Sequence, residues 1–128
     1  MIKWALDASA VLALVNGEPG AELVRNALAD GAVVSTVNLS ETIAKLTENG
    51  MPEVLIHEAL IPFQPSTVDF DLESAYAAGL LRNATRAAGL SLGGRACLAL
   101  AARLSVPALT TDRAWLSLQP ALAVRAIR

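Results

Sequence analysis

Three acidic residues occupy positions that a parallel sheet would bring together. Asp7 and Asp112 each follow a short apolar run, at 2–6 and 106–110. Glu41 lies in the opening turn of the helix expected after another apolar run. Because ligands of open parallel sheets bind outside the carboxyl ends of the strands, we expect these three side chains to lie within a few ångströms of one another.

A cluster of carboxylates is costly on its own, since like charges at close range disfavour ionisation and raise at least one pKa. A hard divalent cation removes that cost, and carboxylates with water suit Mg²⁺ or Mn²⁺. Taken singly, each acid could instead be a helix cap or a turn residue. We favour a metal site for the three together, because hydroxyl side chains flank them. These are Ser9, two residues after Asp7, and Thr110 and Thr111, just before Asp112.

Strands and helices alternate along the chain. We predict strands over 2–6, 32–35, 106–110 and 122–127. Helices are predicted over 8–15 with Ser9 as cap, 19–29, 36–48, 52–61, 69–88 and 92–104, with a short turn or helix over 112–115. Pro62 and Pro65 leave room only for a short edge strand at Phe63–Gln64. This alternation predicts an α/β fold with a parallel sheet covered on both faces, in a single domain over residues 1–128.

The composition narrows the functional classes. Of 128 residues, 54% are hydrophobic and only 17% are charged, which excludes a disordered chain and suggests that a partner or a second copy covers part of the surface. We expect no membrane span and no signal peptide. The single Cys97 excludes an internal disulfide and agrees with a reducing cytoplasm, and one Cys with one His argues against zinc. A net charge of −2 leaves only local contacts with nucleic acid.

Four stretches of the sequence form an ordered set. They are LDASAVLAL (6–14), NLSE (38–41), LSLG with RACLALA (90–93 and 95–101), and LTTD (109–112). The set resembles the PIN domain family, and within it the VapC toxins of bacterial VapBC toxin–antitoxin pairs. The resemblance implies a three-layer α/β/α PIN-like fold with a mostly parallel sheet. It also implies a cytoplasmic chain that pairs with a VapB-type antitoxin, forms a homodimer and acts on RNA.

The same resemblance implies a metal-dependent endoribonuclease toxin. Asp7 and Asp112 would bind Mg²⁺ or Mn²⁺, and Glu41 would bind it directly or through water. Ser9 and Thr111 would orient the carboxylates and water by hydrogen bonds. The metal would lower the pKa of a bound water and hold phosphate oxygens during RNA cleavage.

One position departs from the family pattern. The family places a fourth carboxylate before the Arg-Ala of the third stretch, where this chain has Gly94. An acidic residue three positions after Ser91 would complete a helix capping box, whereas Gly93 and Gly94 weaken the start of the helix. The change is either drift in a domain that no longer cuts RNA or an inactivating substitution, and we favour the second. Either explanation predicts weaker metal binding and severely reduced cleavage.

Other side chains have simpler interpretations. We expect Cys97 in the core, His57 in solvent, and Trp4 and Trp115 in packing. Arg95 and Arg113 are candidate contacts for RNA phosphate. Lys45 is a third candidate, with an ordinary helix ion pair as its alternative. An antitoxin groove could form from Leu12, Leu14, Val15, Leu23 and Val24.

Two other functions compete with a nuclease. An aspartate-nucleophile phosphatase also has an Asp at the end of its first strand. It needs a second Asp two residues later and a late Lys, whereas here Ser9 stands at the first position and the only lysines are Lys3 and Lys45. The second alternative is a catalytically inactive PIN-fold binding module that acts through protein partners, which Gly94 makes credible.

Overall fold

A five-stranded parallel sheet forms the centre of the computed structural model, which describes residues 1–118 and 122–128. In spatial order the strands are β3 (Thr67–Val68), β2 (Ala32–Ser35), β1 (Trp4–Leu6), β4 (Ala108–Thr110) and β5 (Val124–Ala126). Every pairing is parallel, as the alternation of strands and helices predicted. Because β1 lies between β2 and β4, the three strands that precede the acidic residues end side by side.

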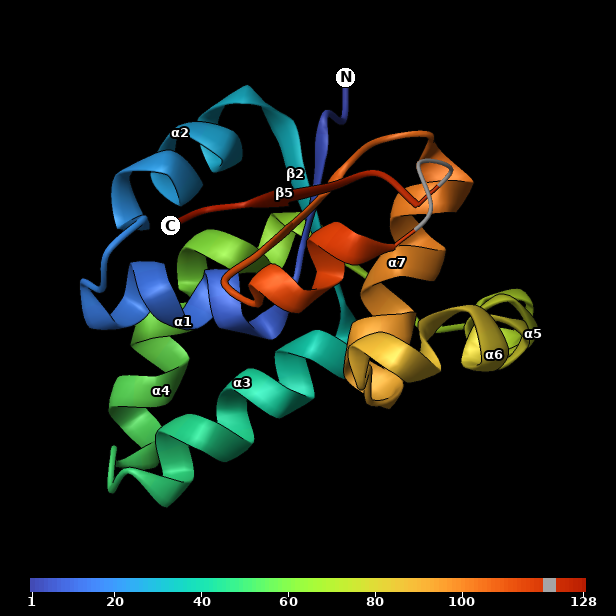
Figure 1. The fold of residues 1–128 in the computed structure, drawn as a ribbon. Helices are drawn as coiled ribbons and strands as arrows, with labels where there is room; N and C mark the ends of the chain where they lie inside the picture. The colour runs from blue at the N-terminus through green and yellow to red at the C-terminus, as the bar shows by residue number, and fades with distance from the viewer. Residues whose placement is uncertain (119–121) are drawn as a thin grey trace.

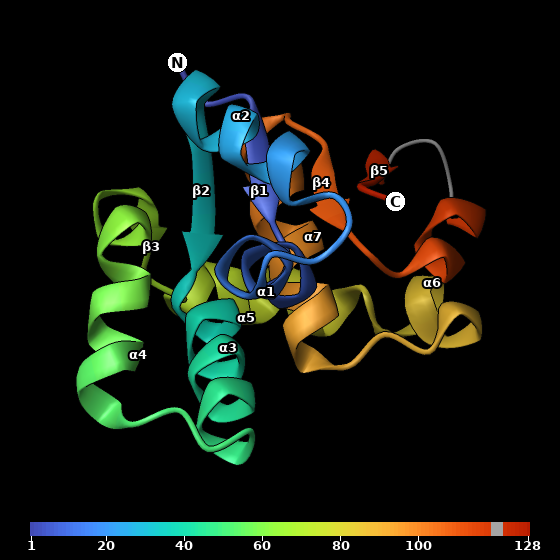
Figure 2. The same cartoon turned by 90° about the vertical axis from the view of Figure 1, so that its left-hand side faces the viewer.

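Helices cover both faces of the sheet (Figure 1, Figure 2). On one face lie α1 (Ala8–Asn16), α2 (Ala21–Gly31), α3 (Thr36–Glu48), α4 (Glu53–Leu60) and the 3₁₀ helix η1 (Ile61–Ser66). On the other lies α7 (Leu92–Leu104), with α5 (Leu72–Leu80) packed against it. The remaining short helices are α6 (Arg82–Thr85), η2 (Arg86–Ala88) and η3 (Arg113–Ser117). Figure 2 shows α3 and α4 extending beyond the carboxyl ends of the strands.

The pleat of the strands divides the core in two, because successive side chains point to opposite faces. Leu6, Val34 and Leu109 belong to a cluster with apolar side chains of α1 to α4. Their neighbours Ala5, Val33 and Ala108 belong to a second cluster with side chains of α7. The two clusters confirm the predicted three-layer α/β/α arrangement.

Two predicted elements differ in the structure. Phe63–Gln64 lies in η1 rather than in a strand, because Pro62 and Pro65 lack the N–H groups that a strand ladder needs. The edge strand β3 begins only after both prolines. The long helix predicted over 69–88 is interrupted after Leu80, and the Thr85 hydroxyl donates back to the carbonyl of Leu81 at 2.8 Å. Such side-chain bonds to the preceding turn bend helices.

The start of α1 also differs from the prediction. Asp7, not Ser9, occupies the N-cap position, and its side chain makes no capping hydrogen bond. The Ser9 hydroxyl instead donates to the Asp7 carboxylate. The residue chosen as a cap thus belongs to the acidic site.

Other predicted placements can be compared directly. Cys97 is buried, and burial raises the pKa of its thiol well above the ordinary value, so it is not a reactive thiolate. His57 is exposed on α4, 3.8 Å from Glu53. Val24 is fully buried in the core, so it cannot line an open antitoxin groove. In the part of the chain that the structure describes, no helix is long and apolar enough to span a bilayer.

Candidate active site

Asp7 is buried at the carboxyl end of the central strand, where its side chain is fixed by hydroxyl groups. Ser9 Oγ donates to Asp7 Oδ2 at 2.7 Å and Thr110 Oγ1 donates to the same atom at 3.0 Å. The backbone N–H of Thr111 donates to Ser9 Oγ at 3.0 Å, and that of Asp112 to Thr110 Oγ1 at 3.0 Å. The backbone after β4 therefore positions the hydroxyls of Ser9 and Thr110, and these hydroxyls position the Asp7 carboxylate.

Glu41 is held against the first turn of α7 by a buried amide. Asn38 is fully buried, and its Nδ2 donates to Glu41 Oε1 at 3.2 Å and to the carbonyl of Gly93 at 2.9 Å. A Cβ atom at residue 93 would overlap the Glu41 carboxylate. Glycine is therefore required at this position for the carboxylate to lie so close to α7.

Burial and mutual repulsion favour protonation of the two inner carboxylates. Burial raises the pKa of Asp7 above its ordinary value, and the hydrogen bonds from Ser9 and Thr110 offset part of that rise. Burial also raises the pKa of Glu41, and the negative charge of Asp7 adds to the rise. Hydrogen bonding from Asn38 and the positive charge of Lys45 act in the opposite direction. A cation beside these two carboxylates would offset both the cost of burying their charges and the repulsion between them.

Asp112 lies farther out, at the exposed start of η3. Its Oδ1 accepts a hydrogen bond from the backbone N–H of Ala114 at 3.0 Å, so it caps this short helix. Asp7, Glu41 and Asp112 line one cavity of about 270 Å³. Within 1–118 and 122–128, however, no three Asp, Glu, His or Cys side chains lie close enough to share one metal ion. The structure brings the three predicted acids to one pocket, with Asp7 and Glu41 as the electrostatically coupled pair.

The donors in this pocket fit a hard divalent cation. Asp7, Ser9, Glu41 and Asp112 offer oxygen to this pocket, and the two inner carboxylates have raised pKas that a positive charge would lower. A family model described as PIN domain matches residues 5–119. The chain belongs to the PIN domain family.

Solved structures agree with this fold assignment. DNA-bound VapBC from Salmonella typhimurium superposes with a TM-score of 0.76 at 18% identity, covering 100% of both chains. VapBC2 from Rickettsia felis, bound to a promoter DNA fragment, gives 0.71 at 18% identity over 98% of each chain. VapBC-5 from Mycobacterium tuberculosis gives 0.61 at 20% identity, over 100% of this chain and 99% of that one. A search of curated protein sequences finds no significant relative. At these identities the similarity establishes the fold.

Gly94 lines the same pocket as the acids of this PIN domain. A Cβ atom built there would meet Leu90 Cγ and Trp115 Cζ2, each at 3.0 Å. Apolar side chains therefore pack close to the position where the sequence analysis expected a carboxylate. Gly93 and Gly94, which look alike in the sequence, have different roles: Gly93 accommodates Glu41, whereas Gly94 borders packed carbon atoms.

The three basic residues considered for RNA contact occupy different environments. Lys45 lines the acidic pocket and lies 3.7 Å from Glu48 in an exposed ion pair, so both interpretations of it fit. Arg95 extends between α7 and α5, where its Nη1 donates to the carbonyl of Ala78 at 3.1 Å. Arg113 donates from Nη1 to the carbonyl of Arg128 at 3.0 Å. Lys45 is thus the best placed of the three for a substrate in the pocket.

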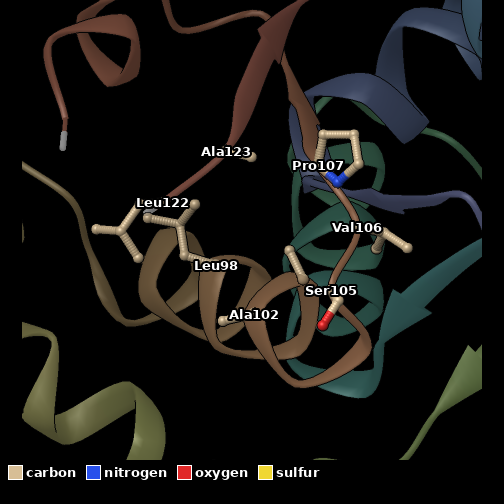
Figure 3. A pocket seen from close by; sticks show the side chains of 8 residues that line it. Leu98, Ala102, Ser105, Val106, Pro107, Leu122 and Ala123 are labelled. Atoms are coloured by element: carbon tan, nitrogen blue, oxygen red, sulfur yellow. The ribbon is translucent and has the colours of Figure 1, made fainter. Parts of the chain in front are cut away.

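A second cavity of about 330 Å³ lies at the other end of β4 (Figure 3). Its lining comes from α7, from the turn into β4 and from the segment before β5, and it consists of Leu98, Ala101, Ala102, Ser105, Val106, Pro107, Leu122 and Ala123. None of these side chains is acidic or basic. This cavity therefore offers no alternative centre for phosphate chemistry.

Two residues of the site were not assigned an orienting role from the sequence. Thr110 donates to Asp7, whereas Thr111, the predicted orienting residue, contributes its backbone N–H. Asn38 positions Glu41, and its signal was the spacing of three residues that puts both on one face of α3. The contact of Asn38 with Gly93 joins positions 55 residues apart, which local spacing cannot reveal.

Proposed function

We propose that this PIN domain is the VapC-like toxin of a toxin–antitoxin pair, a metal-dependent endoribonuclease whose cleavage is impaired by Gly94. The observation that carries the proposal is a single pocket at the carboxyl ends of three adjacent strands. It is lined by Asp7, Glu41 and Asp112 and also by Gly94. The neighbouring folds named VapBC support the toxin assignment, and the acids support the chemistry.

In this proposal Asp7 and Asp112 hold Mg²⁺ or Mn²⁺, and Glu41 contributes directly or through water. A divalent cation bound there supplies activation of water and neutralises charge on a phosphate. The chain's own residues position these groups: Ser9 and Thr110 fix the Asp7 carboxylate, and Asn38 fixes that of Glu41. No side-chain nucleophile is needed.

Lys45 is the residue we assign to the substrate. It lines the pocket on α3, one turn after Glu41, and carries a positive charge where the other charged lining residues are acidic. Lys acts as a point charge toward phosphate, so it would attract an RNA backbone without reading bases. This local contact is compatible with the net charge of −2.

The deciding experiment is magnesium-dependent cleavage of an RNA panel by the chain as given and by Gly94→Asp. We expect little cleavage by the first and a clear gain in the second, because a fourth carboxylate strengthens metal binding. The Cβ contacts with Leu90 and Trp115 mean that these side chains must shift by a few tenths of an ångström. Unfolding curves of both chains would show whether the fold accepts the change.

Two controls separate chemistry from packing. Gly94→Ala adds the same Cβ without a carboxylate, so it should gain no cleavage. Gly94→Asp combined with Asp7→Asn retains the new carboxylate but loses an inner acid, and should be inactive. A folded Gly94→Asp chain that shows no gain on any RNA would contradict the impaired-nuclease proposal.

The alternative is a PIN-fold binding module that acts through protein partners, with an antitoxin as the first candidate. An open groove of about 480 Å³ between α3 and α4 favours it, lined in part by Leu39, Ile43, Met51, Ile56 and Leu60. Such a surface suits the apolar face of an amphipathic helix. Calorimetric titration with Mg²⁺ distinguishes the two functions. A disarmed nuclease gains affinity on Gly94→Asp, whereas a true scaffold binds no metal in either form.

A further inference from the structure

Charge is divided unevenly between two parts of the chain. Residues 1–73 hold eleven of the twelve acidic residues and three of the ten basic ones, which gives a net charge of −8. Residues 74–128 hold Asp112 as their single acid and seven arginines, which gives a net charge of +6. The net charge of −2 for the whole chain therefore conceals a strongly polarised molecule. Charge asymmetry of this kind is one sign of contact with a polyanion.

The acidic pocket lies on the boundary between these two parts. The first part contributes Asp7, Glu41 and Lys45 to the lining, and the second contributes Asp112 together with neutral residues such as those at 89–91. None of the seven arginines, all of which the structure describes, belongs to this lining. The positive charge of the second part is therefore available outside the pocket, where a long substrate would extend.

Two of these arginines, Arg82 and Arg86, stand on the short helices α6 and η2 that lead into the pocket wall. Between them Thr85 is fully buried, and its hydroxyl donates to the carbonyl of Leu81 at 2.8 Å. Both arginines are exposed. The carbonyl of Arg86 accepts the N–H of Gly89 at 3.0 Å, and Gly89 lines the pocket. The buried threonine and this turn therefore hold the two arginines on the solvent side, next to the pocket.

A third arginine joins them from the far end of the sequence. Helix η2 contacts η3, which begins at Arg113, directly after Asp112. Arg113 is exposed, and its Nη1 donates to the carbonyl of Arg128 at 3.0 Å. We call Arg82, Arg86 and Arg113 the basic rim. Within 1–118 and 122–128, no ion pair joins any of the three to an acidic side chain.

Other arginines of the chain already have acidic partners. Arg103 pairs with Asp71 and Glu73, and Arg128 pairs with Glu18. An arginine that shares its N–H groups with an internal carboxylate has fewer of them left for an external anion. Among the described residues the basic rim has no such internal partner, so its positive charge is free to attract an anion from solution.

We propose that the basic rim binds the phosphates of single-stranded RNA and guides the strand out of the acidic pocket over α6 and η2. This inference rests on the proposed nuclease function, because it concerns the substrate of the same pocket. Each guanidinium can donate two N–H groups to the oxygens of one phosphate. With Lys45 on the α3 side of the pocket and the basic rim on the other, the strand crosses the acids between two positive sites.

The rest of the surface argues for this one direction. Three exposed acids, Glu53 and Glu58 on α4 and Asp69 before α5, would repel a phosphate backbone. Figures 1 and 2 both show α4 and α6 at opposite sides of the molecule (Figure 1, Figure 2). A strand that leaves the pocket is therefore attracted on the α6 side and repelled on the α4 side. The basic rim consists of only three side chains, which suits a single strand better than the broad basic surface of a duplex-binding protein.

The first test is the salt dependence of RNA binding in EDTA, measured by fluorescence anisotropy with a labelled oligouridine, which forms no hairpin. Each neutralised phosphate of a single strand contributes about 0.7 to the slope of log affinity against log salt. Replacing both Arg82 and Arg86 by Ala should lower the magnitude of that slope by about 1.4, and should weaken binding at low salt on the order of tenfold.

Two matched variants control for net charge and for packing. Lys3→Ala with Arg25→Ala removes the same charge from exposed positions in the acidic part of the chain, so the slope should not change. Arg82→Lys with Arg86→Lys keeps the charge at the rim, so most of the slope should be retained. Thermal unfolding of each variant verifies that the fold is intact.

The second test separates this inference from the proposed function. In a Gly94→Asp chain that cleaves RNA, Arg82→Ala with Arg86→Ala should raise KM and leave kcat unchanged, because the rim binds substrate and transition state equally. Cleavage with an unchanged KM would contradict the basic rim alone. If Gly94→Asp cleaves no RNA, the proposed function fails, whereas the binding of oligouridine still decides the role of the rim.

Four results would overturn the proposal. The first is an unaltered chain that does not bind oligouridine at low salt. The second is a folded Arg82→Ala, Arg86→Ala chain with unchanged slope and affinity. The third is an equal loss in the Lys3→Ala, Arg25→Ala control, which would mean that binding follows net charge. The fourth is a loss of binding to duplex DNA or to a polyglutamate peptide while oligouridine binding stays intact, which would assign the rim to another partner.

Discussion

The acidic pocket has two sides that are built differently. Around Asp7, the carboxylate accepts hydrogen bonds from the hydroxyls of Ser9 and Thr110, and these hydroxyls accept in turn from backbone N–H groups. Around Gly94, the nearest atoms to a new side chain are carbons of Leu90 and Trp115. One side is organised to hold a charged group, and the other is packed like a core.

In the proposed function, Gly94 leaves the site one carboxylate short, whereas the part of the site around Asp7 stays in place. The network around Asp7 has no purpose in packing alone, because burying a carboxylate costs free energy that the hydroxyls only partly offset. In the proposed function, this network belongs to the scaffold that holds the metal. The apolar packing at Gly94 indicates that restoring an acid there requires a local rearrangement.

The largest effect is expected from Gly93→Ala. The added methyl group would overlap the Glu41 carboxylate and force it away from α7 and from Asn38. The displaced atoms are the flexible end of Glu41, so the cost in unfolding free energy comes chiefly from the lost hydrogen bond with the buried Asn38 amide, about 1–3 kcal/mol. Metal affinity should fall as well, because Glu41 leaves the pocket. Denaturant unfolding and Mg²⁺ titration measure the two effects, and unchanged values for both would mean that Glu41 has other positions available.

Thr110→Val should have the next largest effect. Valine has nearly the same shape, but it removes the donor to Asp7 Oδ2 and the acceptor for the N–H of Asp112. Leaving buried polar groups without partners costs about 1–3 kcal/mol. The matched change Thr111→Val should cost much less, because only the backbone of that residue takes part. Equal losses of unfolding free energy in the two variants would show that the Thr110 hydroxyl stabilises the fold no more than the Thr111 hydroxyl does.

The free energy of unfolding of the metal-free chain should depend on pH, because the pKas of Asp7 and Glu41 are raised in the fold. In the unfolded chain Asp7 and Glu41 ionise near their ordinary pKa values of 3.8 and 4.5, whereas both pKas are raised in the fold. Their contribution to stability is therefore complete below pH 3.8 and is lost as pH rises through the folded pKas. Unfolding in EDTA should show this decline. In Asp7→Asn the decline should be smaller, and in the unaltered chain Mg²⁺ should reverse it.

Gly94→Ala should have the smallest effect. Alanine improves the helix by about 1 kcal/mol, while the crowding against Leu90 and Trp115 opposes that gain. We expect a net change within about 1 kcal/mol in either direction, clearly below that of Gly93→Ala. Paired unfolding curves of the two alanine variants provide the comparison. A loss at Gly94 as large as that at Gly93 would mean that the apolar side of the pocket is rigid, and that Gly94→Asp needs a companion change such as Leu90→Ala.

Most of the fold could be predicted from the sequence. Alternating apolar runs and helical patterns gave β2 and α7 at their observed bounds and predicted the parallel sheet. Predictions failed where long-range packing or back-bonding overrides local preference, as at Leu81 in the interrupted helix and at Phe63 between two prolines. These differences lie at the edge of the sheet and in the connections, away from the strands that position the acids.

The candidate site, like the fold, could be predicted from the sequence only in part. Position relative to strand ends was enough to bring Asp7, Glu41 and Asp112 to one pocket, because parallel strands share their carboxyl edge. Residue type was not enough to choose between Thr110 and Thr111, since which neighbour points inward depends on how the chain leaves β4. The sequence by itself identified four positions that line this one pocket, Asp7, Glu41, Gly94 and Asp112. Only the tertiary structure could distinguish Gly93 from Gly94, because the atoms that each glycine faces come from α3 in one case and from η3 and the loop before α7 in the other.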